Sequence, residues 1–113
     1  MSDCIFCKII AGEIPSTKIY EDDKVVAFRD IHPQAPVHFL VVPKEHIQSA
    51  ADITTENSGI IAYCFEVIAK LAKQEKLENG FRVINNCGEN AGQTVPHIHF
   101  HVLAGRPLGE TLV

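Results

Sequence analysis

The segment Thr94–His101, "TVPHIHFH", constrains the fold more than any other part of the chain. It places half of the six histidines at alternate positions, His97, His99 and His101. In a β-strand, side chains two residues apart leave the same face, about 6.5–7 Å from one another. Ile98 and Phe100 then point the other way, into an apolar layer. The segment therefore predicts a strand that has a core on one face and a row of imidazoles on the other.

Apolar and turn patterns along the rest of the chain predict an α+β fold. Runs rich in β-branched and aromatic residues, bounded by turn residues, predict five strands: Ile19–Glu21, Val25–Arg29, Val37–Pro43, Phe81–Asn85 and His97–Leu103. The links between them are short, and the sequence offers one long helix and one short N-terminal helix. The sheet is therefore expected to be mostly antiparallel, with the helices on one face.

The long helix is expected within residues 53–80. Apolar residues repeat there at helical spacing and form one stripe: Ile61, Cys64, Phe65, Ile68, Leu71 and Ala72. Thr54 or Thr55 is expected to cap the start of this helix, and Asn79 with Gly80 is expected to end it.

Length and charge limit the kinds of protein that this chain can be. A chain of 113 residues suits a single domain, residues 1–113. Its net charge of -4 argues against a broad nucleic-acid or acidic-membrane surface, because both need basic patches. No stretch approaches the ~20 apolar residues of a membrane span, and the N-terminus lacks the pattern of a signal peptide. These features predict a cytoplasmic protein, in which the four cysteines are expected as thiols or metal ligands rather than disulfides.

A row of imidazoles on one strand face suits three kinds of surface. It is a solvated face, a zinc site of the His-x-His type, or a site where neutral imidazole attacks phosphorus while neighbouring donors bind the phosphoryl oxygens. The loop Asn86–Thr94 favours an anion, because its small residues let backbone N–H groups approach a phosphate, and Gln93 and Thr94 add side-chain donors. Its glycines are equally explained by a simple turn.

The segment "HIHFHV" fits the His-x-His-x-His-hydrophobic signature of the histidine triad (HIT) superfamily. The opening "CIFCKI", residues 27–47 and residues 85–106 resemble its nucleotide-binding Hint-like branch, so the resemblance covers nearly the whole chain. It implies a homodimeric α+β protein that acts as a purine nucleoside phosphoramidase or nucleotidyl hydrolase. One alternative is a nucleotide-binding, zinc-stabilised interaction protein with incidental hydrolysis. Another is a metallohydrolase that uses the triad as catalytic zinc ligands.

The resemblance also implies roles for individual residues. His99 attacks the α-phosphorus of a substrate such as adenosine 5′-phosphoramidate and forms a nucleotidyl-histidine, which water hydrolyses to the nucleoside monophosphate. His101 and Asn86 contact the phosphate, Thr94 lies near the leaving group, and His38 is a further active-site histidine. The remaining nucleotide-binding residues are Asp30 for the ribose, Gln93 in the loop, and Phe6, Ile9, Phe28, Ile31 and Leu40 for the base.

Cys4 and Cys7 form a Cys-x-x-Cys pair, which on its own is half of a zinc site or a redox pair. The resemblance implies that a histidine after "PK" and the first histidine of the triad complete the site, as in bacterial members that carry this pair. These residues are His46 and His97, and the result is a closed, structural Zn²⁺ site. The chemical step is then expected to need no metal. Arg29 departs from the family pattern, in which a histidine beside the ribose is frequent.

Overall fold

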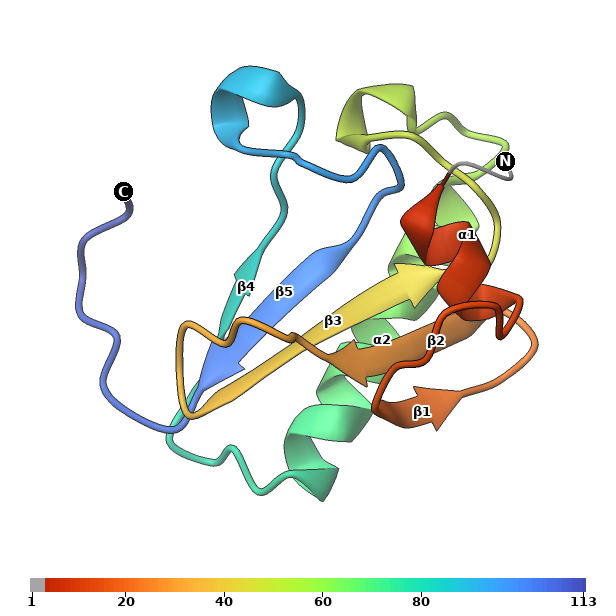
Figure 1. Cartoon of the computed structure of the whole chain (residues 1–113). Coiled ribbons are helices and arrows are strands. Elements are labelled where there is room, and N and C mark those ends of the chain that lie inside the picture. The colour runs from red at the N-terminus through yellow and green to blue at the C-terminus, as the bar shows by residue number, and fades with distance from the viewer. Residues whose placement is uncertain (1–3) are drawn as a thin grey trace.

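The computed structural model describes residues 4–113, which form one antiparallel sheet with two α-helices (Figure 1). The strands are β1 (Lys18–Glu21), β2 (Val25–Arg29), β3 (Val37–Pro43), β4 (Arg82–Ile84) and β5 (Phe100–Ala104). Their order is β1-β2-β3-β5-β4, and every neighbouring pair is antiparallel. The helices are α1 (Ile5–Ile10) and α2 (Ser58–Gln74), with short 3₁₀ turns at Ala50–Asp52 and Glu89–Ala91. The predicted five-stranded α+β fold is confirmed, and no helix in residues 4–113 is long and apolar enough to cross a membrane.

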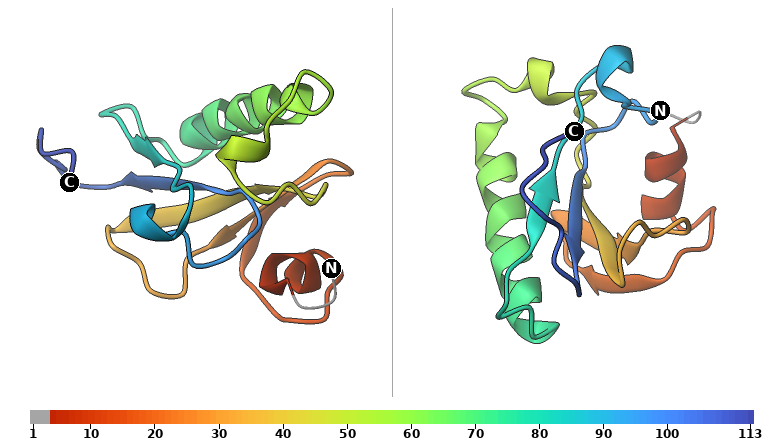
Figure 2. Two further views of the ribbon diagram at one scale, coloured as in Figure 1. Left: turned by 90° about the horizontal axis from the view of Figure 1, so that it is seen from above. Right: turned by 90° about the vertical axis from the view of Figure 1, so that its left-hand side faces the viewer.

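The two helices cover opposite faces of the sheet (Figure 2), so the prediction that both lie on one face is wrong. The cluster under α2 contains Val25, Ala27, Phe39 and Val41, and the cluster under α1 contains Val26, Phe28, Leu40 and Val42. Because β2 and β3 are apolar at almost every position, both of their faces need a cover. The short α1 supplies the second cover and with it one wall of the candidate site.

The start of α2 differs from the predicted cap. The helix begins at Ser58, and its N-cap Asn57 makes no side-chain capping bond. Thr54 lies one turn earlier, where its hydroxyl accepts a hydrogen bond from the Glu56 N–H (3.2 Å) and its own N–H donates to Asn57 Oδ1 (2.7 Å). These polar side chains therefore close a turn in front of the helix instead of capping it.

The end of α2 also comes earlier than predicted. The chain reverses at Lys76, whose φ of 62° is left-handed. The N–H groups of Lys76 and Leu77 donate to the carbonyls of Lys73 (3.1 Å) and Ala72 (2.9 Å). This is a Schellman motif with lysine at the position that glycine usually takes. Leu77 packs against the core under α2, and this apolar contact ends the helix before Asn79 is reached.

The last strand, β5, begins at Phe100 instead of the predicted His97. His97 and His99 lie in the segment that leads into the strand, where the Ile98 N–H donates to the Ile47 carbonyl at 2.7 Å. The predicted alternation is nevertheless confirmed, because Ile98 and Phe100 belong to the core under α2 while the histidines contact the α1 side. The histidine row therefore faces the space under α1.

Candidate functional site

A cavity of about 500 Å³ is lined by α1, the loop after it, β2, β3, the loop that begins at Asn86, and the histidine row. One part of the lining is a broad apolar wall, which includes Ile5, Phe6, Ile9, Ile14, Phe28, Ile31, Leu40 and Val95. The other part is a mostly polar group, which consists of Pro15, Ser16, Arg29, Asp30, Asn86, Gly92, Thr94, His99 and His101. A mostly apolar cavity with a few convergent polar groups is typical of a small-molecule site.

Most of the residues predicted to bind nucleotide therefore meet in one place. All five predicted base-contacting residues line the cavity, although Ile31 is 85% exposed and lies at the rim. His38 and Gln93 are not part of the lining. His38 is buried behind His101, and the Gln93 side chain is engaged elsewhere.

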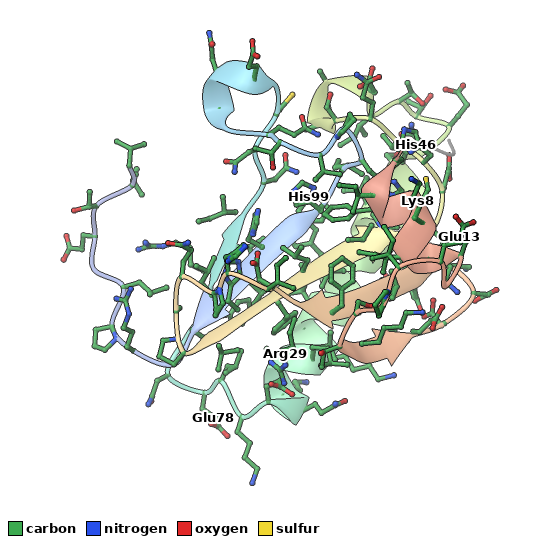
Figure 3. The ribbon with its side chains drawn as sticks, viewed as in Figure 1. Lys8, Glu13, Arg29, His46, Glu78 and His99 are labelled. Carbon is green, nitrogen blue, oxygen red and sulfur yellow. The ribbon has the colours of Figure 1, made fainter. Side chains whose placement is uncertain are left out.

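His99 is buried, and the backbone fixes its tautomer. Its Nδ1 lies 2.8 Å from the carbonyl oxygen of His97, which can only accept, so Nδ1 carries the proton and Nε2 keeps a lone pair. Burial lowers the pKa of His99 and keeps the ring neutral. The edge of the Phe6 ring packs against it, with 4.9 Å between ring centroids. His99 therefore brings a neutral, oriented ring with an unprotonated Nε2 to the cavity, at the entry to β5 (Figure 3).

A series of hydrogen bonds that starts at a backbone N–H makes His101 a hydrogen-bond donor. The Gln34 N–H donates to His38 Nδ1 (3.0 Å), so the neutral His38 carries its proton on Nε2. That Nε2–H donates to His101 Nδ1 (2.9 Å), which leaves the His101 proton on its own Nε2. Burial, above all, lowers the pKa of both rings, and it brings the pKa of His101 to about 4 with the help of His99 and His38. His101 is therefore a neutral N–H donor on the cavity lining.

Asp30 has one carboxylate oxygen in a turn and the other beside these histidines. Oδ1 accepts from the His32 N–H (2.7 Å), in the turn that an aspartate forms readily with the backbone two residues on. Oδ2 lies 3.4 Å from His38 Nε2 and 3.9 Å from His101 Nδ1. Because each carboxylate oxygen has two lone pairs, Asp30 keeps acceptor capacity for the hydroxyl groups of a ligand.

Gln93 braces the loop and does not face the cavity. Its Oε1 accepts from the Gly88 N–H (2.8 Å), and its Nε2 donates to the carbonyls of Gln48 (2.8 Å) and Val95 (3.0 Å). These hydrogen bonds engage both the oxygen and the nitrogen of the Gln93 amide. The geometry therefore favours Gln93 as a support for the loop over the predicted role of a direct nucleotide donor.

Arg29 belongs to the cavity lining, and its guanidinium group is engaged by an ion pair. Its Nη2 lies 2.8 Å from Glu75 Oε1, at the end of α2 on the other face of the sheet. Figure 3 shows Arg29 beside the last turn of that helix. The departure from the family pattern therefore places beside the cavity a cation that Glu75 already neutralises.

Cys4, Cys7, His46 and His97 converge at the start of α1, with their ligand atoms all within 4.8 Å of one another. The Sγ–Nδ1 distances are 3.4 Å for Cys4–His97, 3.3 Å for Cys7–His46 and 3.6 Å for Cys7–His97, and the two Nδ1 atoms are 3.1 Å apart. A tetrahedral Zn²⁺ with ordinary bonds to sulfur and nitrogen needs ligand separations of about 3.3–3.8 Å. The three Sγ–Nδ1 separations lie in this range and the Nδ1–Nδ1 separation is slightly shorter, so the four residues fit a tetrahedral zinc site with a small adjustment.

Protonation in this Cys/His cluster also suits a cation. The Nε2–H of His97 donates to the Pro43 carbonyl (2.8 Å), so its Nδ1 faces the sulfurs with a lone pair. The Cys7 N–H donates to Cys4 Sγ (3.4 Å), a contact that stabilises a thiolate. Burial and the neighbouring Cys4 raise the pKa of Cys7, so two thiolates here require a neutralising charge. A bound Zn²⁺ supplies that charge.

A second group of metal-ligand types, Asp30, His38 and His101, does not suit a cation. His38 Nε2 carries a proton because its Nδ1 accepts from the Gln34 N–H, and that proton is shared with His101. A cation would need lone pairs on both of these nitrogens. His99 belongs to neither group among residues 4–113. The geometry therefore does not favour the metallohydrolase alternative.

Fold and site together define a small α+β protein in which one row of histidines borders both a ligand cavity and a Cys/His cluster. The model of the HIT domain family matches residues 11–108. The chain belongs to the HIT domain family, as the sequence resemblance predicts.

Similar proteins are known from bacteria and plants. A purine nucleoside phosphoramidase of Escherichia coli (strain K12) is 48% identical over 111 residues, which cover 97% of this chain and 93% of that protein. A 14 kDa zinc-binding protein of Zea mays is 49% identical over 109 residues, which cover 95% of this chain and 85% of that protein. The solved structure of a HIT family hydrolase from Clostridium thermocellum is 45% identical, with a TM-score of 0.97 over 100% of this chain and 99% of the other.

Two backbone groups that set histidine tautomers are not predicted from the sequence. They are the Gln34 N–H and the Pro43 carbonyl. Backbone groups carry no residue-type signature, so nothing in the pattern of side chains identifies them. The visible signal is the pair Pro33 and Pro36, which flank Gln34 and restrict the loop that aims its N–H at the histidine pair.

The lowered pKa of His101 predicts a pH-dependent stability. The unfolded chain takes up the proton near the ordinary value of 6.5 and the folded chain only near pH 4, so the free energy of unfolding should fall as pH falls between these values. Substitution of His101 by glutamine should make the free energy of unfolding depend less steeply on pH, by at most the contribution of one proton. Urea unfolding from pH 7 to pH 4 measures this dependence. The exposed His32→Gln is the matched control and should keep the wild-type slope. Equal slopes in all three proteins would contradict the assignment.

Proposed function

We propose that the chain is a nucleotidyl hydrolase that cleaves purine nucleoside 5′-phosphoramidates through a covalent intermediate on His99. The observation that carries this proposal is the neutral His99 ring on the cavity lining, with its Nδ1–H held by a carbonyl and its Nε2 lone pair free. Similarity to a protein named purine nucleoside phosphoramidase and to a HIT family hydrolase supports the same chemistry.

The lining offers a place for each part of such a substrate. A purine fits the apolar wall, where Phe6 and Phe28 pack edge to face with 5.5 Å between centroids. The ribose hydroxyls donate to Asp30. The phosphoryl oxygens accept from the Nε2–H of His101 and from Asn86, which leaves the amine near Thr94.

The chemistry then takes two steps. The Nε2 lone pair of His99 forms a bond to the α-phosphorus while the P–N bond breaks, and the amine leaves with a proton that it takes from solvent. The His97 carbonyl, which accepts from Nδ1–H, stabilises the positive charge that develops on the ring. Water next attacks the phosphorus and gives up a proton to solvent, the bond to His99 breaks so that the neutral ring is restored, and the nucleoside monophosphate is released. His101 stabilises the oxygens in both steps as a donor and keeps its proton.

Substitution of His99 tests this mechanism directly. We expect His99→Ala to lose roughly 10³-fold or more in kcat, because the nucleophile is gone, while AMP still binds through the base and ribose contacts. Wild-type protein quenched during turnover of adenosine 5′-phosphoramidate should show one added nucleotidyl group on His99 by peptide mass spectrometry. The exposed His32→Ala should behave as wild type. Full turnover by His99→Ala or an adduct on another residue contradicts the mechanism, and AMP binding without any adduct favours a nucleotide-binding protein.

We also propose that Cys4, Cys7, His46 and His97 hold one structural Zn²⁺. The fit of their separations and protonation supports this, as does similarity to a protein named for zinc binding. When bound, the metal neutralises the two thiolates. It would then fasten α1 to the segments that carry the two histidines, and His46 lies beside the start of that helix in Figure 3. Because α1 carries Phe6 of the cavity wall, the metal would support nucleotide binding but not the chemical step.

Shared use of α1 predicts that zinc and nucleotide strengthen each other's binding. By thermodynamic reciprocity, AMP should tighten zinc by the same factor by which zinc tightens AMP. The measurements are zinc release to a chromogenic chelator with and without AMP, and AMP affinity with and without zinc. Cys4→Ser should lose zinc and lower the melting temperature, whereas the exposed Cys87→Ser, outside the cluster, should change neither. Well under one zinc per chain in fresh protein, or an unchanged Cys4→Ser, contradicts the site.

We propose that two copies form a homodimer through β4 and α2. β4 is an edge of the sheet among the described residues, and exposed aromatic side chains lie nearby, Phe65 on α2 (46% exposed) and Phe81 just before β4 (41% exposed). An edge strand bordered by apolar side chains suits pairing with a second copy.

The dimer is tested by a charge placed at this edge. Phe81→Asp should convert the protein to monomer in sedimentation velocity at micromolar concentration, because the charge opposes burial against a second copy. Thr17→Asp, at an exposed position before the opposite edge strand β1, should leave the dimer intact. A monomeric wild type, or a dimer that is unaffected by Phe81→Asp, contradicts this interface.

A further inference from the structure

The proposed nucleophile lies just outside the hydrogen-bonded part of the sheet. β4 and β5 pair from Arg82 with Leu103 to Ile84 with His101, and the ladder ends there. In the same register His99 would face Asn86, the first residue of the loop that lines the cavity. The backbone ladder therefore stops two residue pairs short of His99, the residue whose position matters most.

A side-chain hydrogen bond holds His99 where the backbone hydrogen bonds of the ladder have ended. Asn85 Nδ2 donates to the carbonyl oxygen of His99 at 2.9 Å, in a partly buried contact. Because a carbonyl oxygen can only accept, the amide nitrogen of Asn85 must be the atom that faces it. This bond joins the last residue before the cavity loop to the backbone of the nucleophile itself.

The backbone of His99 is thereby held on both sides. Before it, the Ile98 N–H donates to the Ile47 carbonyl at 2.7 Å. After it, the His99 carbonyl is held by Asn85, while the ring is oriented by the His97 carbonyl. Without the Asn85 amide, nothing in the β4–β5 ladder would secure His99 against the β4 side.

We propose that Asn85 is a positioning residue for the phosphoryl-transfer step. This inference rests on the proposed function. Asn85 does not line the cavity, but the next residue, Asn86, does. By tying the end of β4 to His99, the Asn85 amide fixes the separation between the nucleophile and Asn86, which contacts the phosphate in the proposed complex. Attack on phosphorus is sensitive to that separation, since a misplacement of about 1 Å costs on the order of 10²-fold in rate.

Three substitutions of Asn85 distinguish the effect of its amide group from the effect of its side-chain volume. Asn85→Leu has a similar size and no donor, Asn85→Asp places an acceptor opposite the carbonyl oxygen, and Asn85→Gln keeps the amide on a longer arm. Rapid quench with adenosine 5′-phosphoramidate measures the rate constant of adduct formation on His99, and calorimetry measures AMP affinity. Asn79→Leu, at an exposed position in the turn after α2, is the matched control.

We expect adduct formation to slow roughly 10- to 100-fold in Asn85→Leu and Asn85→Asp, with partial recovery in Asn85→Gln. AMP affinity should change less than about threefold, because the base and ribose contacts do not depend on the nucleophile. This division between rate and affinity is the signature of positioning. A structural rung alone would lower affinity, rate and melting temperature together.

Adduct formation within about twofold of the wild type in both variants overturns the inference, and so does a parallel loss of AMP affinity. If Asn85→Leu fails to fold, the comparison of Asn85→Asp with Asn85→Gln decides the question, because these two differ in the donor. A wild-type protein that forms no adduct on His99 overturns the proposed function and this inference with it. An adduct that forms at an unchanged rate in the variants overturns the inference alone.

Discussion

The arrangement of the site depends on hydrogen bonds that decide which nitrogen of each histidine carries the proton. A nucleophile and a metal ligand need a lone pair, whereas a phosphate contact needs an N–H, so each ring is useful in one tautomer only. Backbone carbonyls hold the protonated nitrogens of His97 and His99, and the Gln34 N–H orders the His38–His101 pair. Because backbone groups do not titrate in this range, they keep these tautomers as long as the rings stay neutral.

One row of histidines faces two environments because the start of α1 lies beside the first histidine of the row. His97 points to the start of α1 with the two cysteines, and His99 points into the cavity that α1 covers. Phe6 packs against both rings, with its ring centroid 6.0 Å from that of His97 and 4.9 Å from that of His99. A six-residue helix has almost no stability of its own. The cavity wall therefore depends on the apolar contacts under α1 and on the Cys/His cluster at its start.

The sequence predicts what depends on local periodicity and residue type. Alternation over His97–His101 was enough to assign faces, because a strand-like segment keeps that alternation even before the ladder begins. The end of α2 at Lys76 was not predictable, since it is decided by Leu77 docking on a core that only the tertiary fold creates. The sequence does not predict the contacts of Gln34 and Asn85 for a similar reason. In each, one partner is a backbone group that the fold brings close, and no spacing in the sequence reveals it.

The described cavity offers an anion mainly oriented neutral donors, because Arg29, the cationic residue of its lining, is paired with Glu75. Burial lowers the pKa of His99 and His101, Asp30 adds a negative charge, and the Arg29 guanidinium is paired with Glu75 on the other face of the sheet. Neutral N–H groups in a buried site act at short range and depend strongly on direction. Their bonds strengthen as negative charge develops on the phosphoryl oxygens, whereas a lysine or arginine would hold substrate and product tightly in every state. Such a lining suits turnover better than storage of a nucleotide, as expected of a hydrolase rather than a binding protein.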